Sequence, residues 1–208
     1  MNTSGTLAAI VLAAGTSQRM GEANKLLLDA GGRPVLARVL QAFAGAPYAT
    51  TIVVTGAQHE QVAEAATRAE HVHLAHNPAY RTGMASSIRC GIQAAGRPVA
   101  GYAICPGDLP LLTAPTVRRL GEAFATHVPP RIVVPTCDER RGHPVLFDQS
   151  FRDALLQLHG DRGARELLRH HTDAIVAVDV EDDGIYRDVD TPDALRAARR
   201  HLRHRARP

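Results

Sequence analysis

The first Gly-rich segment of this 208-residue chain lacks both familiar phosphate-binding fingerprints. Gly15 and Gly21 are separated by five residues without a glycine, so a dinucleotide-binding G-x-G-x-x-G is absent. Glu22 follows Gly21, so the Gly-Lys-Ser/Thr ending of a P-loop is absent as well. The first absence counts against a nicotinamide oxidoreductase.

The sequence is also poor in cysteine and in long apolar runs. Cys90, Cys105 and Cys137 are odd in number and have no C-x-x-C spacing, which excludes a disulfide framework and a zinc site as expectations. The apolar run near the N-terminus is too short for a membrane span, and no basic segment precedes it. We therefore expect a cytoplasmic protein without a membrane partner.

Positive charge is concentrated at one end. Residues 196–208 carry six arginines and no acid, whereas the remainder, with 18 basic and 21 acidic residues, has a net charge of −3. An acidic partner protein or nucleic acid could contact this end, but it has no aromatic side chain for base stacking. A solvated terminal helix is the favoured interpretation.

Apolar, β-branched runs alternate with helix-like stretches along the chain. This alternation predicts one domain over residues 1–208, of the three-layer α/β class, with a mostly parallel sheet and helices on both faces. The predicted strands are Leu7–Ala13, Thr51–Thr55, Val72–Ala75, Tyr102–Cys105, Arg131–Pro135, His143–Phe147 and Ala174–Val180. The predicted helices are Pro34–Ala44, His59–Ala69, Met84–Ala95, Pro115–His127, Phe151–Leu158, Ala164–His170 and Pro192–Arg203.

The loop after the first strand combines small residues, hydroxyls and cations. It contains Gly15, Thr16, Ser17, Arg19 and Lys25. Glycine lets the backbone approach a ligand closely, and backbone N–H groups with two cations suit a polyphosphate. The loop indicates a nucleoside triphosphate site, although a plain strand-to-helix connection with surface cations is the alternative.

Two aspartates follow strands or precede helices later in the chain. Asp108 lies in a Pro-Gly-Asp turn after an apolar strand, and Asp190 directly precedes Thr191 and Pro192. Each could be an ordinary turn or cap residue. Because ligands bind at the carboxyl ends of parallel strands, the two carboxylates can instead meet there and bind Mg²⁺ beside substrate phosphates.

Five motifs in order resemble those of a known family. LAAGTSQRMG with a later lysine, NPAYRTGMASSI, GDLPLL, RGHPVLF and DVDTPDAL resemble the molybdenum cofactor cytidylyltransferases, a branch of the MobA-like nucleotidyltransferases. The resemblance extends from Leu7 to about Ala198. It implies a Rossmann-like nucleotidyltransferase fold.

The resemblance also implies roles for individual residues. Arg19, Lys25 and Asp108 are the expected catalytic residues, and Asp108 with Asp190 are the expected Mg²⁺ ligands. The residues expected to bind the nucleotide are Leu12, Ala13, Ala14, Gly15, Thr16, Ser17, Arg19, Lys25, Thr55, Gly56, Ser86, Ser87 and Asp108. The loop expected to face the acceptor contains Gly142, His143 and Pro144.

The implied reaction transfers CMP from CTP to the terminal phosphate of molybdopterin or the molybdenum cofactor and releases pyrophosphate. A molybdenum hydroxylase is a candidate recipient of the product. Ala14 occupies the place of a glycine in guanylyl-transferring relatives, and its methyl group favours cytosine over a purine.

Three alternatives remain at this point. A relative of the same fold could use GTP or another phosphorylated acceptor, such as a phosphosugar. A non-catalytic nucleotide-binding or delivery protein would be expected to lack a charged member of the site, yet all are present. A nicotinamide oxidoreductase is the third.

The histidines do not indicate a further metal site. His143 could contact the acceptor or only pack beside Pro144. The other histidines considered as metal ligands have no nearby cysteine or acid that completes a site, and we interpret them as surface residues: His71, His73, His76, His170 and His171.

Overall fold

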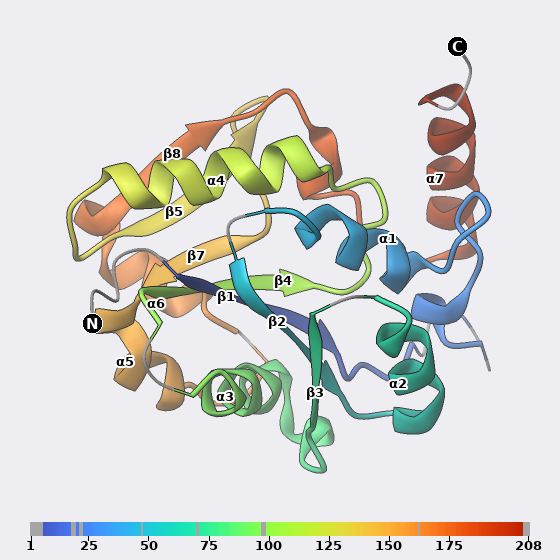
Figure 1. Ribbon diagram of the computed structural model, residues 1–208, viewed down its shortest axis with the longest axis horizontal. Coiled ribbons are helices and arrows are strands. Elements are labelled where there is room, and N and C mark those ends of the chain that lie inside the picture. The colour runs from blue at the N-terminus through green and yellow to red at the C-terminus, as the bar shows by residue number, and fades with distance from the viewer. Residues whose placement is uncertain are drawn as a thin grey trace.

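One mixed sheet forms the centre of the molecule (Figure 1). The computed structural model describes residues 6–17, 20, 23–46, 48–69, 71–96, 99–161 and 163–205. Its sheet order is β3-β2-β1-β4-β7-β5-β6, and β8 pairs with the other edge of β5. The strands are β1 Leu7–Ala13, β2 Tyr48–Thr55, β3 Val72–His76, β4 Gly101–Pro106, β5 Ile132–Cys137, β6 Arg140–Arg141, β7 Val145–Asp148 and β8 Ile175–Asp179.

Most of the strand pairs are parallel. β1 pairs in parallel with β2 and β4, β2 with β3, and β5 with β8. β7 is antiparallel to both β4 and β5, so β4 and β5 run in the same direction. The carboxyl ends of β1, β4 and β5 and the start of β7 consequently meet at one edge of the sheet.

Helices cover both faces of this sheet. The α-helices are α1 Val35–Phe43, α2 His59–Thr67, α3 Met84–Ala94, α4 Ala114–Thr126, α5 Arg152–Leu156, α6 Arg165–His170 and α7 Pro192–Arg205. Short 3₁₀ turns are η2 Lys25–Leu27, η3 Tyr80–Thr82, η4 Gln149–Phe151, η5 Thr172–Ala174 and η6 Asp183–Ile185. Apolar residues of α1, α2, α4 and α7 form one core cluster, and those of α3 and α5 form the other.

The alternation of side chains along β1 explains the two layers. Ala9 and Val11 belong to the core under α1 and α4, whereas Ala8 and Ile10 belong to the core over α3. All four are fully buried, as expected for a central strand covered on both faces. The predicted three-layer fold is therefore confirmed.

Helix starts follow the expected capping chemistry. Thr113 caps α4 by accepting a hydrogen bond from Thr116 N, and Pro115 lies in the first turn. Thr191 Oγ1 accepts a hydrogen bond from Ala194 N at the start of α7. The terminal helix predicted for the arginine-rich end is confirmed up to Arg205.

Two details of the sheet differ from the sequence prediction. The strand predicted at His143–Phe147 begins at Val145 and is antiparallel to its neighbours. The two-residue strand β6 was not predicted; it returns along β5 after a turn in which Asp138 and Glu139 have positive φ. Neither residue is glycine, so the usual sequence signal for such a turn is missing.

No helix in the described part of the chain has both the length and the apolar character needed to cross a bilayer.

Candidate active site

Lys25 connects two aspartates that are distant in sequence. Lys25 lies in η2, after the loop that follows β1, and its Nζ donates to Asp108 Oδ2 and to Asp190 Oδ1. Asp108 follows β4, and Asp190 precedes α7. The backbone also joins the two carboxylate segments, because Val189 N donates to Asp108 O over 3.0 Å. The predicted convergence of these three residues is what the fold produces.

The two carboxylates keep the Lys25 ammonium charged. Burial by itself lowers the pKa of Lys25, but the charges and hydrogen bonds of Asp108 and Asp190 outweigh burial and raise that pKa above its usual value. Lys25 is therefore a permanent cation at neutral pH. A fixed cation of this kind can stabilise charge on phosphoryl oxygens.

A third carboxylate completes an acidic group. Oxygen atoms of Asp108, Asp188 and Asp190 all lie within 4.8 Å of one another. Burial, followed by the charges of Asp190 and Asp108, raises the pKa of Asp188. Asp108 Oδ1 is buried and has no hydrogen-bond partner among the described residues. Oxygen donors with an uncompensated buried oxygen suit a hard divalent cation, so these residues fit a metal ion.

A cavity of about 880 Å³ opens beside this group. One part of its wall comes from the β1 loop, η2 and Asp108, and the other comes from the start of α3 and the loop before α6. Its volume is within the range of small-molecule sites. The lining residues are Leu12, Ala14, Gly15, Thr16, Ser17, Lys25, Leu26, Tyr80, Arg81, Gly83, Met84, Ser87, Pro106, Asp108 and Asp161.

The loop after β1 is closed at its base by side-chain hydrogen bonds. Ser17 Oγ accepts from Lys25 N at 3.2 Å, and Asn24 Oδ1 accepts from Leu26 N at 3.0 Å. A Cβ on Gly15 would meet no atom within 4 Å, so the packing of the described residues does not itself require glycine there. Ala13 is buried in the core below the loop.

Asn77 organises the two serines of α3. Its Nδ2 donates to Ser86 Oγ at 2.8 Å and to Ser87 Oγ at 3.0 Å. Ser86 Oγ donates in turn to Ala79 O and Gly83 O, which fixes the turn before α3. Both serines were predicted to bind the nucleotide. Ser87 lines the cavity, whereas Ser86 supports its wall.

Thr55 and Gly56 are not in the cavity wall. Thr55 shares its side of β2 with Val53, under α2, and its hydroxyl contacts His59 Nδ1 and Ala75 O. Gly56 has a packing role instead, because a Cβ there would lie 2.7 Å from Tyr80 Cβ and 2.8 Å from Ala14 Cβ. The structure thus places both behind the wall rather than on it.

The predicted acceptor loop lies at the same edge of the sheet. Gly142 N donates to Pro135 O, and His143 N donates to Ile185 O at 2.8 Å. His143 Nδ1 is buried with no partner among the described residues. Burial lowers the pKa of His143; the charge of Asp108 raises it, and the charge of Arg165 lowers it further. Pro144 is buried and leads into β7.

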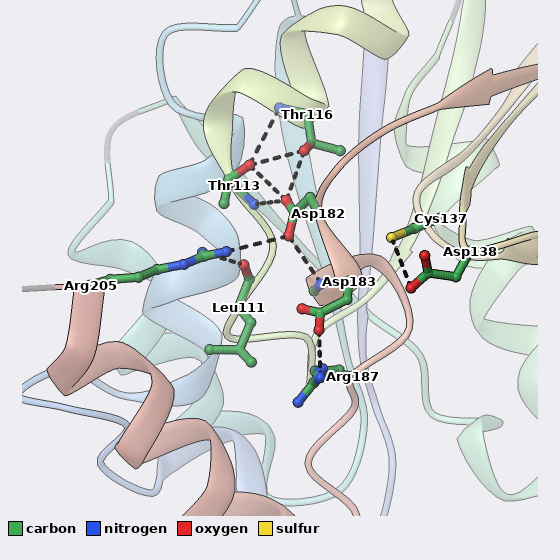
Figure 2. A network of polar contacts seen from close by, with 10 residues as sticks. Leu111, Thr113, Thr116, Cys137, Asp138, Asp182, Asp183, Arg187 and Arg205 are labelled. Carbon is green, nitrogen blue, oxygen red and sulfur yellow. Dashed lines mark hydrogen bonds and ion pairs between the residues drawn. The ribbon is translucent and has the colours of Figure 1, made fainter.

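Asp182, which does not line the cavity, is the centre of a separate network of polar contacts (Figure 2). Asp182 Oδ2 accepts from Thr113 N, Thr113 Oγ1 and Thr116 Oγ1 at 2.6–3.0 Å, and Oδ1 accepts from Gly184 N. Arg205 from α7 lies 3.9 Å away and also donates to Leu111 O. Asp182 therefore fixes α4 and η6, and η6 carries the carbonyl that binds the His143 backbone.

Some predicted site residues are not described by the structure, and some residues of the site were not predicted. Arg19 and Gly21 lie outside the described residues. Asp188, two residues before Asp190, was not among the predicted metal ligands, yet it belongs to the acidic group. Asp161 was overlooked, and its Gly-Asp-x-Gly context was the available signal. Tyr80 and Gly83, which belong to the NPAYRTGMASSI motif, also line the cavity.

A family model for the MobA-like NTP transferase domain matches residues 9–175. The chain belongs to the MobA-like NTP transferase family. Nicotine blue oxidoreductase of Paenarthrobacter nicotinovorans is 30% identical over 194 residues, covering 89% of this chain and 93% of that protein. The family predicted from the sequence is therefore confirmed.

Solved structures agree with the fold. Rv0371c of Mycobacterium tuberculosis is 26% identical, with a TM-score of 0.81, over 95% of this chain and 98% of that one. Rv0371c has also been solved in complex with manganese. A molybdopterin-guanine dinucleotide biosynthesis protein A from Archaeoglobus fulgidus, 18% identical over 95% and 99% of the two chains with a TM-score of 0.69, shares the fold. A divalent metal ion is consistent with the acidic group of this chain.

Proposed function

We propose that this protein transfers CMP from CTP to the terminal phosphate of molybdopterin or the molybdenum cofactor, with Mg²⁺ as the metal ion. The observation that carries the proposal is the convergence of Lys25, Asp108 and Asp190 beside the cavity. Membership of an NTP transferase family supports the reaction class. The cytosine preference is supported by Ala14, which lines the cavity.

The reaction needs positioning and charge more than proton transfer. An oxygen of the acceptor phosphate forms a bond to the α-phosphorus of CTP, and the bond from that phosphorus to the bridging oxygen breaks to release pyrophosphate. The acceptor phosphate is already anionic, so no general base is required. Phosphoryl transfer of this kind depends on electrostatic stabilisation of the phosphoryl oxygens.

Each part of the site then has a role. Lys25 contributes a fixed positive charge at the α-phosphate, together with Arg19. Asp108 and Asp190, joined by Asp188, provide oxygen ligands for Mg²⁺, which when bound neutralises phosphate charge. We assign the acceptor to the loop from Gly142 to Pro144, which lies at the same edge of the sheet but outside the wall of the cavity.

Pyrophosphate release tests the proposal. Purified protein is mixed with molybdopterin, Mg²⁺ and either CTP or GTP, and the dinucleotide product is analysed by mass spectrometry. We expect release with CTP that depends on both acceptor and metal ion. Release with GTP alone would replace the proposal by a guanylyltransferase, and release with neither would refute both.

The relative named as an oxidoreductase supports a second candidate. A nicotinamide dinucleotide also carries phosphates that could occupy the cavity, although the first Gly-rich segment lacks its usual fingerprint. Binding of NADPH measured against CTP separates the candidates. We expect CTP to bind in a metal-dependent manner and NADPH not to compete with it.

A further inference from the structure

Asp161 places a carboxylate in the wall of the cavity on the α3 side. It lies in the loop between α5 and α6, and its Oδ1 accepts a hydrogen bond from Met84 N at 3.2 Å. Gly83, at φ 111°, allows this approach, because a Cβ there would lie 2.6 Å from the backbone of Gly160. Ala85 N also donates to Gly160 O at 3.0 Å. The loop is thus fixed against the first turn of α3.

The wall around Asp161 differs from the wall around Lys25. Lys25 and the β1 loop offer a cation and backbone N–H groups, which suit phosphates. The wall on the α3 side contains Ala14, Tyr80, Gly83 and Asp161. Ala14 and Tyr80 are neighbours, because both pack against Gly56. A carboxylate repels phosphate, so this side suits the uncharged part of a nucleotide. Arg81 is the cation of this side, and its Nε donates to Tyr80 Oη.

Ser87 supplies the complementary group. Its Oγ accepts a hydrogen bond from Asn77 Nδ2, and it donates none to the described residues. The Ser87 hydroxyl hydrogen can therefore point into the cavity. Asp161, in its ionised form, accepts hydrogen bonds and donates none. Ser87 and Asp161 thus offer a ligand one hydrogen-bond donor and one acceptor.

We propose that Asp161 determines base specificity by accepting a hydrogen bond from the exocyclic amino group of the nucleobase, and so selects CTP over UTP. This inference rests on the proposed function. Cytosine has an amino donor at the position where uracil has a carbonyl acceptor, and carboxylates pair with that amino group. In UTP the uracil carbonyl oxygen would face the carboxylate with no hydrogen between these two acceptors, so UTP would bind more weakly. Ser87 donates to a carbonyl oxygen of the same base.

Binding measurements without the acceptor test the inference. The affinities of CTP, UTP and an N4,N4-dimethyl CTP are measured by titration calorimetry with Mg²⁺. We expect the wild-type protein to bind UTP and the dimethyl analogue at least about tenfold more weakly than CTP, because neither offers an amino hydrogen. Equal affinities for CTP and both analogues overturn the inference while leaving the proposed function in place. A protein that binds no triphosphate overturns both.

The variant Asp161→Asn tests the residue itself. An amide keeps an acceptor for Met84 N but can also donate, so the preference for CTP over UTP should fall at least about tenfold, mainly through tighter UTP binding. Glu166→Gln is the matched control, since Glu166 is an exposed acid on the adjacent α6 and does not line the cavity. An unchanged CTP-to-UTP ratio in a folded Asp161→Asn overturns the inference. If that variant does not fold, the comparison of analogues on the wild type decides.

Discussion

Asp108 lies at the start of the segment between β4 and α4, and Asp182, which follows β8 in the chain, binds Thr113 at the end of that segment. The surroundings of the two carboxylates are opposite. Asp182 is 6% exposed and accepts hydrogen bonds from neutral hydroxyl and backbone donors. Asp108 lies in the cavity wall, contacts the Lys25 cation, is close to two other carboxylates and has one buried oxygen without a partner among the described residues. Satisfied polar groups stabilise a fold, whereas an incompletely satisfied charged group is typical of a functional site.

The largest expected effect comes from Asp108→Asn. The amide cannot replace an anionic metal ligand, so turnover should fall by at least about a thousandfold, or about 4 kcal/mol in barrier. The free energy of unfolding should change little, because the amide is nearly isosteric and Lys25 keeps Asp190 as a partner. Pyrophosphate release and urea unfolding measure the two quantities. Unchanged dependence on the metal ion would contradict the role of Asp108.

Lys25→Ala should separate catalysis from metal binding. Losing a preorganised cation should cost about 3 kcal/mol in barrier, roughly a hundredfold in turnover. Binding of Mn²⁺ should persist, because the three carboxylates remain and lose a competing cation. Calorimetric titration with Mn²⁺ alongside the activity assay checks this. Wild-type turnover in the variant would remove Lys25 from the mechanism.

Asp182→Ala should act on stability. It leaves the hydrogen-bond donors around Thr113 and Thr116 without their acceptor, so the free energy of unfolding should fall by about 2–4 kcal/mol. Asp183→Ala is the matched control: Asp183 pairs with the half-exposed Arg187 at 2.5 Å, and its loss should cost less than about 1 kcal/mol. Urea unfolding of both variants measures the difference. Equal losses would mean that the buried network is no more important than a surface pair.

Asp188→Asn has the smallest effect and depends on pH. Because the pKa of Asp188 is raised in the folded protein, its ionisation destabilises the metal-free fold as pH rises above the usual aspartate value. The variant should therefore be slightly more stable than wild type at neutral pH, and the difference should vanish below about pH 4. Metal affinity should fall by about tenfold. Thermal unfolding across pH and Mn²⁺ titration measure these effects; a variant less stable at neutral pH contradicts the assignment.

The sequence predicted the parts of this site that local chemistry determines. β1 and β4 are neighbouring parallel strands, so their carboxyl ends lie side by side. The loop with Gly15 and Lys25 follows β1, and Asp108 follows β4, so their convergence could be expected. Asp182 could not be recognised, because its partners Thr113 and Thr116 are distant in sequence. Thr55 was assigned to the nucleotide side, but its side chain faces α2, since the direction of a side chain at a strand end depends on register. The antiparallel direction of β7 could not be predicted either, because the turn after β5 has positive φ at Asp138 and Glu139, where no glycine signals it.

The proposed metal site is tested most directly by the position of Mn²⁺ in crystals of this protein grown with CTP, determined by anomalous diffraction. We predict one strong peak coordinated by oxygens of Asp108 and Asp190, with Lys25 Nζ moved from between them towards the α-phosphate. A peak away from these aspartates, or a nucleotide bound while Lys25 still joins both carboxylates without metal, would contradict it.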